Sequence, residues 1–424
     1  MAAGRSEGAG TPMNRDGRQA TIMLAAAQWL ALLSAVAAPV STSAKSVFLV
    51  AMLLAVLASG RLTRILQVAY RQPLGKMLLA LTAWLVVGLF HAPTLWPVRI
   101  HALEAWLVLP LAFVVLGLYD RVAAQRRFAC GYALAMIAWA LVSLWLWVAH
   151  RNPRGQGNGI VMITYTAQSI AFVAAVFACV WLATDRSWHR ALRPVAWAGI
   201  ALLVFNIAYV SSSRTGLVAL AAAVVVIGSL RLRPGRRLMV LAAAGLLMLV
   251  FVSTSSIIQK RFGEAAAEFH TYRTSPVETS IGMRMVLYAN TWGLILRNPV
   301  LGYGTSSFGA VYTPYAAARS GSWQGQPMTD AHCQYLYVWM ENGIVGLLLL
   351  LGLIVVGVRQ GLGLGPAGLV AAGFLTTVAI SSLCNSHFRS LAEGYQLAFI
   401  VGALAARTLD DRVEGVPPQR SVEE

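Results

Sequence analysis

The sequence predicts an all-α polytopic membrane protein with about twelve transmembrane helices and one long outer loop that contains interfacial helices. Of the 424 residues, 58% are hydrophobic and only 12% are charged. A soluble domain keeps roughly a quarter of its residues charged. Half that share, arranged in apolar runs of roughly 15 to 20 residues, indicates a protein whose solvent is lipid.

Twelve apolar stretches account for the predicted spans. They fall near 22–40, 45–60, 76–93, 100–118, 129–149, 160–184, 192–210, 214–230, 237–256, 333–358, 366–385 and 392–407. The first stretch follows a polar, basic head, as the core of a signal peptide does. It is too long for such a core and a second span follows almost at once, so we expect a retained first span.

The basic residues set the orientation. The net charge is +17. Most of the 33 Lys and Arg lie in the segments between spans that would face one side of the membrane, and fewer lie in the segments that would face the other side. Two tight clusters are Arg61/Arg64/Arg71/Lys76 and Arg231/Arg233/Arg236/Arg237. Lys and Arg concentrate in cytoplasmic loops. Both termini are therefore predicted to be cytoplasmic, and no nucleic-acid partner is expected.

This orientation divides the chain into five parts. They are a cytoplasmic tail at 1–20, transmembrane helices 1–9 at 21–256, a long outer loop at 257–331, transmembrane helices 10–12 at 332–408 and a second cytoplasmic tail at 409–424. Loops as long as the outer one are usually functional.

The outer loop contains a predicted interfacial helix. It runs over Arg284–Arg297, beginning after Ser280 and ending before Pro299, since the residue before a proline disfavours helix. Tyr288, Trp292 and Ile295 form an apolar stripe, with Asn290 on another face. A helix of this kind lies along the membrane surface.

A glycine motif follows this helix, with Gly302 and Gly304 in the sequence Gly-Tyr-Gly-Thr-Ser-Ser-Phe. It is not a dinucleotide fingerprint, because no strand precedes it and no helix clearly follows. The glycines are expected to let the backbone turn sharply. The alternative is that their amides point at a phosphate.

Two outer arginines are candidate anion-binding residues. Arg214 stands between two spans with almost no loop around it, and no acidic residue is near in sequence. An arginine near the membrane usually has a partner. Arg284 opens the predicted interfacial helix, where a cation is disfavoured unless it binds an anion. The alternatives are a snorkelling arginine at 214 and a solvated charge at 284.

His332 is the candidate catalytic base. It stands at the entrance to the tenth span, at the membrane boundary, and imidazole accepts a proton near neutral pH. Glu341 follows nine residues later, in an H-x8-E-x-G-x-x-G pattern. The two would face opposite sides of one continuous helix, so they form no dyad unless His332 precedes the helix. The alternative roles are a packed histidine and a glutamate paired with an arginine or serine of a neighbouring span.

Several other polar residues are secondary candidates. These are Arg151, Arg154, Arg99 and Arg389, then Glu104 and His387. The first four are outer arginines, each of which a contact with a lipid headgroup would explain. The other two are a glutamate within a span and a histidine that follows one.

Several kinds of site are unsupported by the sequence. Cys130, Cys179, Cys333 and Cys384 form no C-x-x-C pair. A disulfide between the last two is open, with two free thiols as the alternative. Without a D-x-D pair or carboxylate–histidine cluster on the outer side, no metal is expected. Without a P-loop, no nucleotide or other cofactor is expected.

Three motifs resemble the O-antigen ligase/polymerase superfamily of polytopic glycosyltransferases. They are Ser213-Arg214-Thr215-Gly216, Arg284 with Asn298-Pro299-x-x-Gly302-x-Gly304, and His332 to Gly346. Their order, spacing and common side carry the resemblance across about 135 residues. One departure is Cys333, where the family usually has asparagine.

The resemblance implies a GT-C-like fold and a specific activity. One long loop before the histidine motif is most similar to lipopolysaccharide O-antigen ligases. These transfer O-antigen from undecaprenyl diphosphate to a lipid A-core sugar hydroxyl at the periplasmic face of the bacterial inner membrane, without a metal and with inversion. Arg214 and Arg284 would then bind the donor diphosphate and His332 would deprotonate the acceptor.

Two other functions remain alternatives. An O-antigen polymerase would use the same donor and a second lipid-linked glycan as acceptor. A transporter of lipid-linked glycan would also place arginines inside the bundle. It would be expected to show related halves with broken helices, and no internal repeat is evident.

Overall fold

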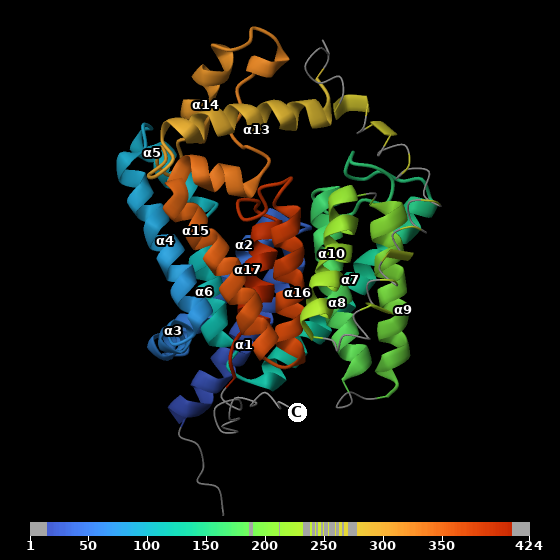
Figure 1. Ribbon diagram of the computed structural model, residues 1–424. Coiled ribbons are helices and arrows are strands. Elements are labelled where there is room, and N and C mark those ends of the chain that lie inside the picture. The colour runs from blue at the N-terminus through green and yellow to red at the C-terminus, as the bar shows by residue number, and fades with distance from the viewer. Residues whose placement is uncertain are drawn as a thin grey trace, which may run out of the picture.

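The computed structural model describes residues 15–185, 190–211, 213–231 and 278–408, together with isolated positions between 238 and 269. The side chains of residues 15–17, 192, 214 and 231 also lie outside this description. Every regular element in the described part is helical (Figure 1). The predicted all-α fold is therefore confirmed.

A described helix covers each predicted stretch except 237–256, most of which lies outside the described residues. The helices are α1 (Arg15–Ala37), α2 (Thr42–Ala58), α3 (Leu62–Tyr70), α4 (Pro73–His91), α5 (Trp96–Glu104), α6 (Val108–Leu118), α7 (Val122–Val148), α8 (Tyr165–Thr184), α9 (Leu192–Phe205) with a π-helical turn (Asn206–Val210), α10 (Arg214–Arg231), α13 (Ser280–Arg297), α14 (Phe308–Ala317), a 3₁₀ turn (Trp323–Gly325), α15 (Gln334–Gly363), α16 (Pro366–Ser381) and α17 (Glu393–Leu404).

Seven of the described helical segments are long and apolar enough to cross a membrane. The bent pair α2 and α3 raises the number to eight if it is one span. The segments Thr215–Leu230 and Pro366–Ser381 are apolar but shorter. The chain is thus a multi-pass membrane protein, and the total of about twelve spans stays a prediction.

The core of the bundle is built around α8. Most of its residues are buried, and it packs against α7, α9 and α16. Alanines such as Ala171 and Ala174 let the helices approach closely. Gln168 of α8 donates to Ser143 Oγ at 3.0 Å and to Asn206 Oδ1 at 3.0 Å. These buried hydrogen bonds join α7, α8 and the π-helical turn, so polar contacts fix how the three elements pack.

One helix of the bundle, α15, is broken at Gly343. Gly343 has φ 66° and ψ −172°, outside the helical region. The segment 299–305 inserts at the break, because Tyr303 N–H donates to Met340 O at 3.0 Å and Gly304 N–H donates to Glu341 O at 2.7 Å. On the other side of the break, Ile344 N–H donates to Pro299 O at 2.9 Å. The backbone groups that the break leaves unpaired are therefore satisfied by the inserted segment.

The glycine motif forms this inserted segment. Gly302 and Gly304 have φ of 70° and 93°, so the expected sharp turns are present. The Gly304 amide is bonded to α15 and the Thr305 amide donates to Gly88 O at 3.1 Å. The protein itself therefore occupies the Gly304 amide, whereas a phosphate contact through the Gly302 amide stays an untested alternative.

The outer loop contains two helices that lie beyond one end of the bundle (Figure 1). The helix predicted over Arg284–Arg297 is present as α13, which begins earlier, at Ser280, and lies across that end. The expectation that no helix follows the glycine motif was wrong, since α14 begins at Phe308.

The prediction of which residues form the apolar face of α13 was partly wrong. Ile295 is buried, but Trp292 is 45% exposed. Asn290, expected on a polar face, is buried and donates to the Tyr312 hydroxyl of α14 at 3.3 Å. Packing against α14 and α15 selects the buried face, and a stripe counted on an isolated helix does not include those partners.

We predict that Gly343→Ala disrupts the broken helix. A Cβ at this position would collide with the Val300 carbonyl oxygen, and a positive φ costs a side-chain-bearing residue roughly 1–3 kcal/mol. A lower apparent melting temperature and loss of monodisperse protein in detergent are expected. The control is Gly352→Ala in the same helix, where the nearest atom to the new Cβ is Met77 Cε at 3.4 Å. Equal behaviour of the two variants would contradict the role given to Gly343.

Candidate active site

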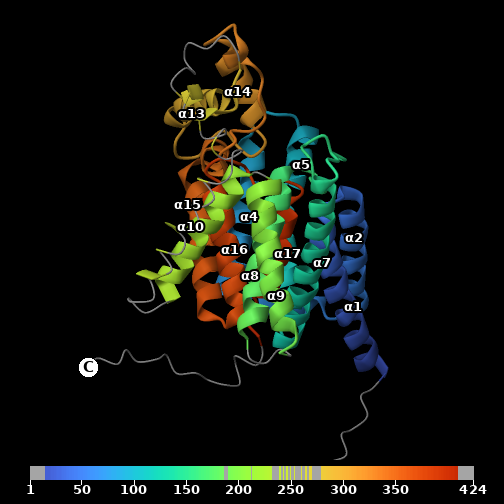
Figure 2. The ribbon, with the colours of Figure 1, turned by 90° about the vertical axis from the view of Figure 1, so that its right-hand side faces the viewer.

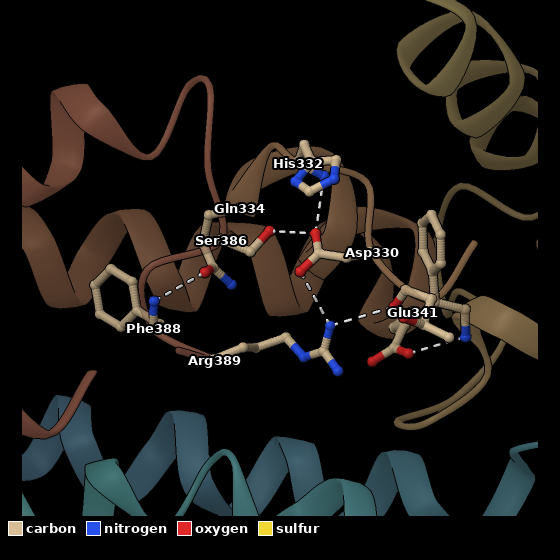
Figure 3. A network of polar contacts seen from close by, with 9 residues as sticks. Asp330, His332, Gln334, Glu341, Ser386, Phe388 and Arg389 are labelled. Atoms are coloured by element: carbon tan, nitrogen blue, oxygen red, sulfur yellow. Dashed lines mark hydrogen bonds and ion pairs between the residues drawn. The ribbon is translucent and has the colours of Figure 1, made fainter. Parts of the chain in front are cut away.

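A polar network lies between the segments 329–334 and 382–391 and the break in α15 (Figure 3). Asp330 is at its centre. Its Oδ1 accepts hydrogen bonds from His332 N–H at 2.8 Å and from the Ser386 hydroxyl at 2.6 Å. Its Oδ2 lies 3.3 Å from Arg389 Nη1. One carboxylate therefore fixes the turn before α15 and a neighbouring arginine together.

Arg389 is held on three sides. Nη1 also donates to Thr329 O at 3.3 Å, and the guanidinium carbon lies 4.3 Å from the centre of the Tyr337 ring. Its Nε is buried and has no hydrogen-bond partner in the described part of the chain. Because the side chain is fixed and still has unused donors, it is suited to bind an oxyanion.

Glu341 is fully buried beside the break in α15. Its Oε1 accepts from Phe308 N–H at 2.9 Å, at the first residue of α14, where the helix dipole favours a negative charge. Arg389 and Tyr337 are the side chains that interact with it electrostatically. Oε2 has no hydrogen-bond partner among the described residues. The expected partner was an arginine or serine side chain; the structure instead gives it a backbone amide, with Arg389 close by.

Two cavities meet at Arg389 and Thr329, which line both. The first, the Glu393 cavity, has a volume of about 470 Å³ and polar walls that include Tyr165, Ser386 and Glu393. The second, the Glu341 cavity, has about 390 Å³ and is lined in part by α5. Its α5 wall contains Val98 and Ala102, with His101 and Glu104. The Arg389 guanidinium is therefore part of the wall of both cavities.

His332 precedes α15, as the sequence required for it to approach Glu341, but the structure records no contact between the two side chains. Its backbone has φ 50°, held by Asp330 and by the Tyr288 hydroxyl, which lies 3.1 Å from His332 O and 2.9 Å from Leu383 O. The imidazole is half-buried. Tyr288 therefore connects α13 to the turn that contains His332.

Arg284 lies one helical turn before Tyr288 in α13. It is the fifth residue of the helix, so it does not open it as expected. Nη1 donates to Ser280 Oγ at 3.3 Å, while Nε is buried without a partner in the described part of the chain. Arg214 begins α10, and its side chain falls outside the described residues. The structure therefore places Arg284 on the same helix as Tyr288, which contacts the His332 backbone, and it does not test the pairing with Arg214.

Other secondary candidates have structural contacts. Arg154 donates to Val161 O and Val40 O at 3.2 and 2.9 Å, and Arg99 donates to Thr94 O and Leu89 O at 2.6 and 2.7 Å. Arg151 is exposed, and Glu104 pairs with His101 at 3.3 Å on the surface. His387 is buried, with its imidazole against Ser381. None of these contacts needs a ligand.

The cysteines are free thiols, so the disulfide left open between Cys333 and Cys384 is not formed. Cys333 is buried at the start of α15, and burial raises the pKa of its thiol. Among the described residues no group of three or more His, Cys, Asp or Glu is placed to hold a metal ion.

A family model described as O-antigen ligase matches residues 199–351. This segment belongs to the O-antigen ligase superfamily. The match includes Arg214, Arg284, His332 and Glu341, and it confirms the resemblance drawn from their motifs. The match indicates a membrane glycosyltransferase-like enzyme of the O-antigen ligase/polymerase type. No curated protein matches the chain.

The sequence reasoning missed Asp330 and Glu393, and it gave Arg389 only as a secondary candidate. The three residues lie inside or after the O-antigen ligase match. Asp330 lies inside the match, two positions before His332. This spacing is typical of an aspartate whose carboxylate accepts a hydrogen bond from the backbone N–H two residues later. Arg389 and Glu393 follow the match in the chain and reach the site only through the fold. No local motif signals them.

We predict that His387 makes stability depend on pH. Burial lowers the pKa of His387 from 6.5 to about 4, so the unfolded chain binds a proton at higher pH than the folded protein does. Stability is then present above about 6.5 and is lost as the pH falls toward about 4, by up to about 3 kcal/mol. Melting temperatures of His387→Gln should fall less over this range than those of wild type. An unchanged slope would contradict the assignment, and His150→Gln, which alters an exposed histidine, is the control.

Proposed function

We propose that the protein is an O-antigen ligase. It transfers O-antigen polysaccharide from undecaprenyl diphosphate to a sugar hydroxyl of lipid A-core, at the periplasmic face of the bacterial inner membrane. One observation carries the proposal beyond the family: a fixed arginine with unused donors lines two cavities. A transferase with two large substrates needs such a place, where donor and acceptor meet at one point of charge stabilisation.

The donor occupies the Glu341 cavity in this proposal. Its α5 wall is partly apolar, and α5 has no buried residue, which suits a lipid-linked substrate that enters from the membrane. Arg389, together with Arg284 and Arg214, supplies guanidinium groups for the diphosphate. Bidentate contacts of this kind stabilise the leaving group without a metal.

The acceptor occupies the polar Glu393 cavity. Its hydroxyl oxygen attacks the anomeric carbon as the bond from that carbon to the diphosphate oxygen breaks. His332 takes the hydroxyl proton, undecaprenyl diphosphate leaves, and the anomeric centre inverts. Cleavage of the sugar–diphosphate bond drives the reaction, so no nucleotide and no other cofactor takes part.

We predict that ligation proceeds in purified components without nucleotide and in the presence of EDTA. The reaction contains the protein, undecaprenyl-diphosphate glycan and rough lipopolysaccharide, with products separated on a gel. Glycan should appear on the lipid A-core. A magnesium or manganese requirement would move the mechanism to another class of glycosyltransferase. Longer lipid-linked glycan without ligation would identify a polymerase instead, and movement of the donor across liposomes without any transfer would identify a transporter.

We predict that replacing His332 and replacing the arginines have different effects on donor binding and turnover. His332→Ala should keep its affinity for undecaprenyl diphosphate and lose turnover by ~10² to 10⁴, because a general base acts in the transition state. Arg284→Ala and Arg389→Ala should weaken donor binding and also lower turnover, by ~10² to 10³ each. Lysine should rescue poorly, since it lacks the planar fork.

The controls for this comparison are exposed residues of the same types. His150 is an exposed histidine that also has a positive φ, and Arg297 is exposed on the same helix as Arg284. Alanine at either position should leave turnover near wild type. Near-normal turnover in His332→Ala, or complete loss of its donor binding, would remove His332 from the role of base.

A further inference from the structure

A second charged cavity lies at the opposite end of the bundle. It has a volume of about 240 Å³ and lies between the start of α1, α3, the end of α6 and the start of α7. Figure 1 shows α3 at the end away from α13 and α14, and Figures 1 and 2 both show the start of α1 there. This end is the one predicted to face the cytoplasm, so the cavity is separate from the candidate active site.

The cavity is lined by more positive than negative charge. Arg61, Arg64, Arg121 and Arg127 surround it, with Asp120 as the acidic residue among its lining side chains. Asp120 pairs with Arg64 at 2.8 Å, and Arg127 donates to the neutral Gln28 amide oxygen at 3.3 Å. Arg61 and Arg121 form no ion pair within the described part of the chain. The cavity therefore has an unbalanced positive charge, which favours an anion.

The remaining walls of the cavity are apolar. Leu24, Ile65 and Leu118 contribute to them, beside small alanines. The helix α3 turns by 104° from α2 and has Ile65 and Val68 on a buried face, with Arg64 and Tyr70 exposed. This apolar face packs against α6, and the bend turns α3 away from the direction of the span. The cavity thus combines arginines with apolar walls at the end of the bundle predicted to face the cytoplasm.

We propose that this cavity binds the headgroup phosphate of an anionic phospholipid of the inner leaflet. The arginines take the phosphate, and the apolar walls cover the glycerol and the first part of the acyl chains. Its volume is below the roughly 300 Å³ typical of sites that enclose a whole small ligand, which suits a headgroup whose chains remain in the bilayer. Basic pockets between transmembrane helices on the cytoplasmic side recognise anionic headgroups in this way.

The test measures lipid binding to the full chain in detergent by native mass spectrometry. Phosphatidylglycerol is titrated against phosphatidylcholine, and inorganic phosphate is the third ligand. Wild type should prefer phosphatidylglycerol. Arg61→Gln/Arg121→Gln should bind it roughly 30-fold more weakly. The matched control, Arg71→Gln/Arg407→Gln, removes two exposed arginines that do not line the cavity and should change affinity by less than about twofold.

A second variant distinguishes binding in the cavity from a general effect of positive charge on lipid binding. Ala25→Trp fills the cavity from an exposed position and keeps every arginine, so it should weaken phosphatidylglycerol binding as the glutamine pair does. It also answers the question if the glutamine pair does not yield folded protein. Equal weakening in the control pair, or unchanged binding in Ala25→Trp, would overturn the proposal. Displacement of the lipid by millimolar inorganic phosphate would assign the site to free phosphate and overturn the lipid assignment.

Discussion

The insertion of residues 299–305 into the break of α15 is the constraint on which the candidate site depends. A break inside a membrane helix leaves backbone donors and acceptors that lipid cannot satisfy. Here Tyr303 and Gly304 donate to the carbonyls before Gly343, and Pro299 accepts from the amide after it. The same insertion brings Phe308, at the start of α14, to the Glu341 carboxylate. The outer loop is thereby anchored to the bundle beside the network of charged residues.

The charges at this place support one another. Asp330 holds both the turn at His332 and Arg389, and Arg389 lies near the buried Glu341. Removal of either carboxylate would leave a partly buried guanidinium with fewer partners, which is costly in a low-dielectric region. In the proposed mechanism the same arrangement keeps a cation ready for the diphosphate without a change of conformation, so little reorganisation is needed during transfer.

The two ends of the bundle use arginine differently. At the end near α13 and α14, Arg389 is restrained by a carboxylate, a carbonyl and an aromatic ring, and Arg284 by a serine. At the other end, Arg61 and Arg121 are exposed around a cavity, and among the described arginines that line it Arg64 has an acidic partner, Asp120. Restraint suits a catalytic contact, which needs fixed geometry, whereas a mobile lipid headgroup can be bound by side chains that adapt.

The sequence by itself determined the helical fold, the family, the helix at Arg284–Arg297 and the turns at Gly302 and Gly304. Hydropathy, proline and glycine are local signals, and they can be recognised without knowledge of tertiary contacts. Only the tertiary structure decided that Asn290 is buried, that α14 follows the glycine motif, and that Arg389 and Thr329 lie between two cavities. Arg389 lies 48 positions after Glu341 in the chain. Their proximity arises from the packing of α15, α16 and α17, which no pattern along the chain encodes.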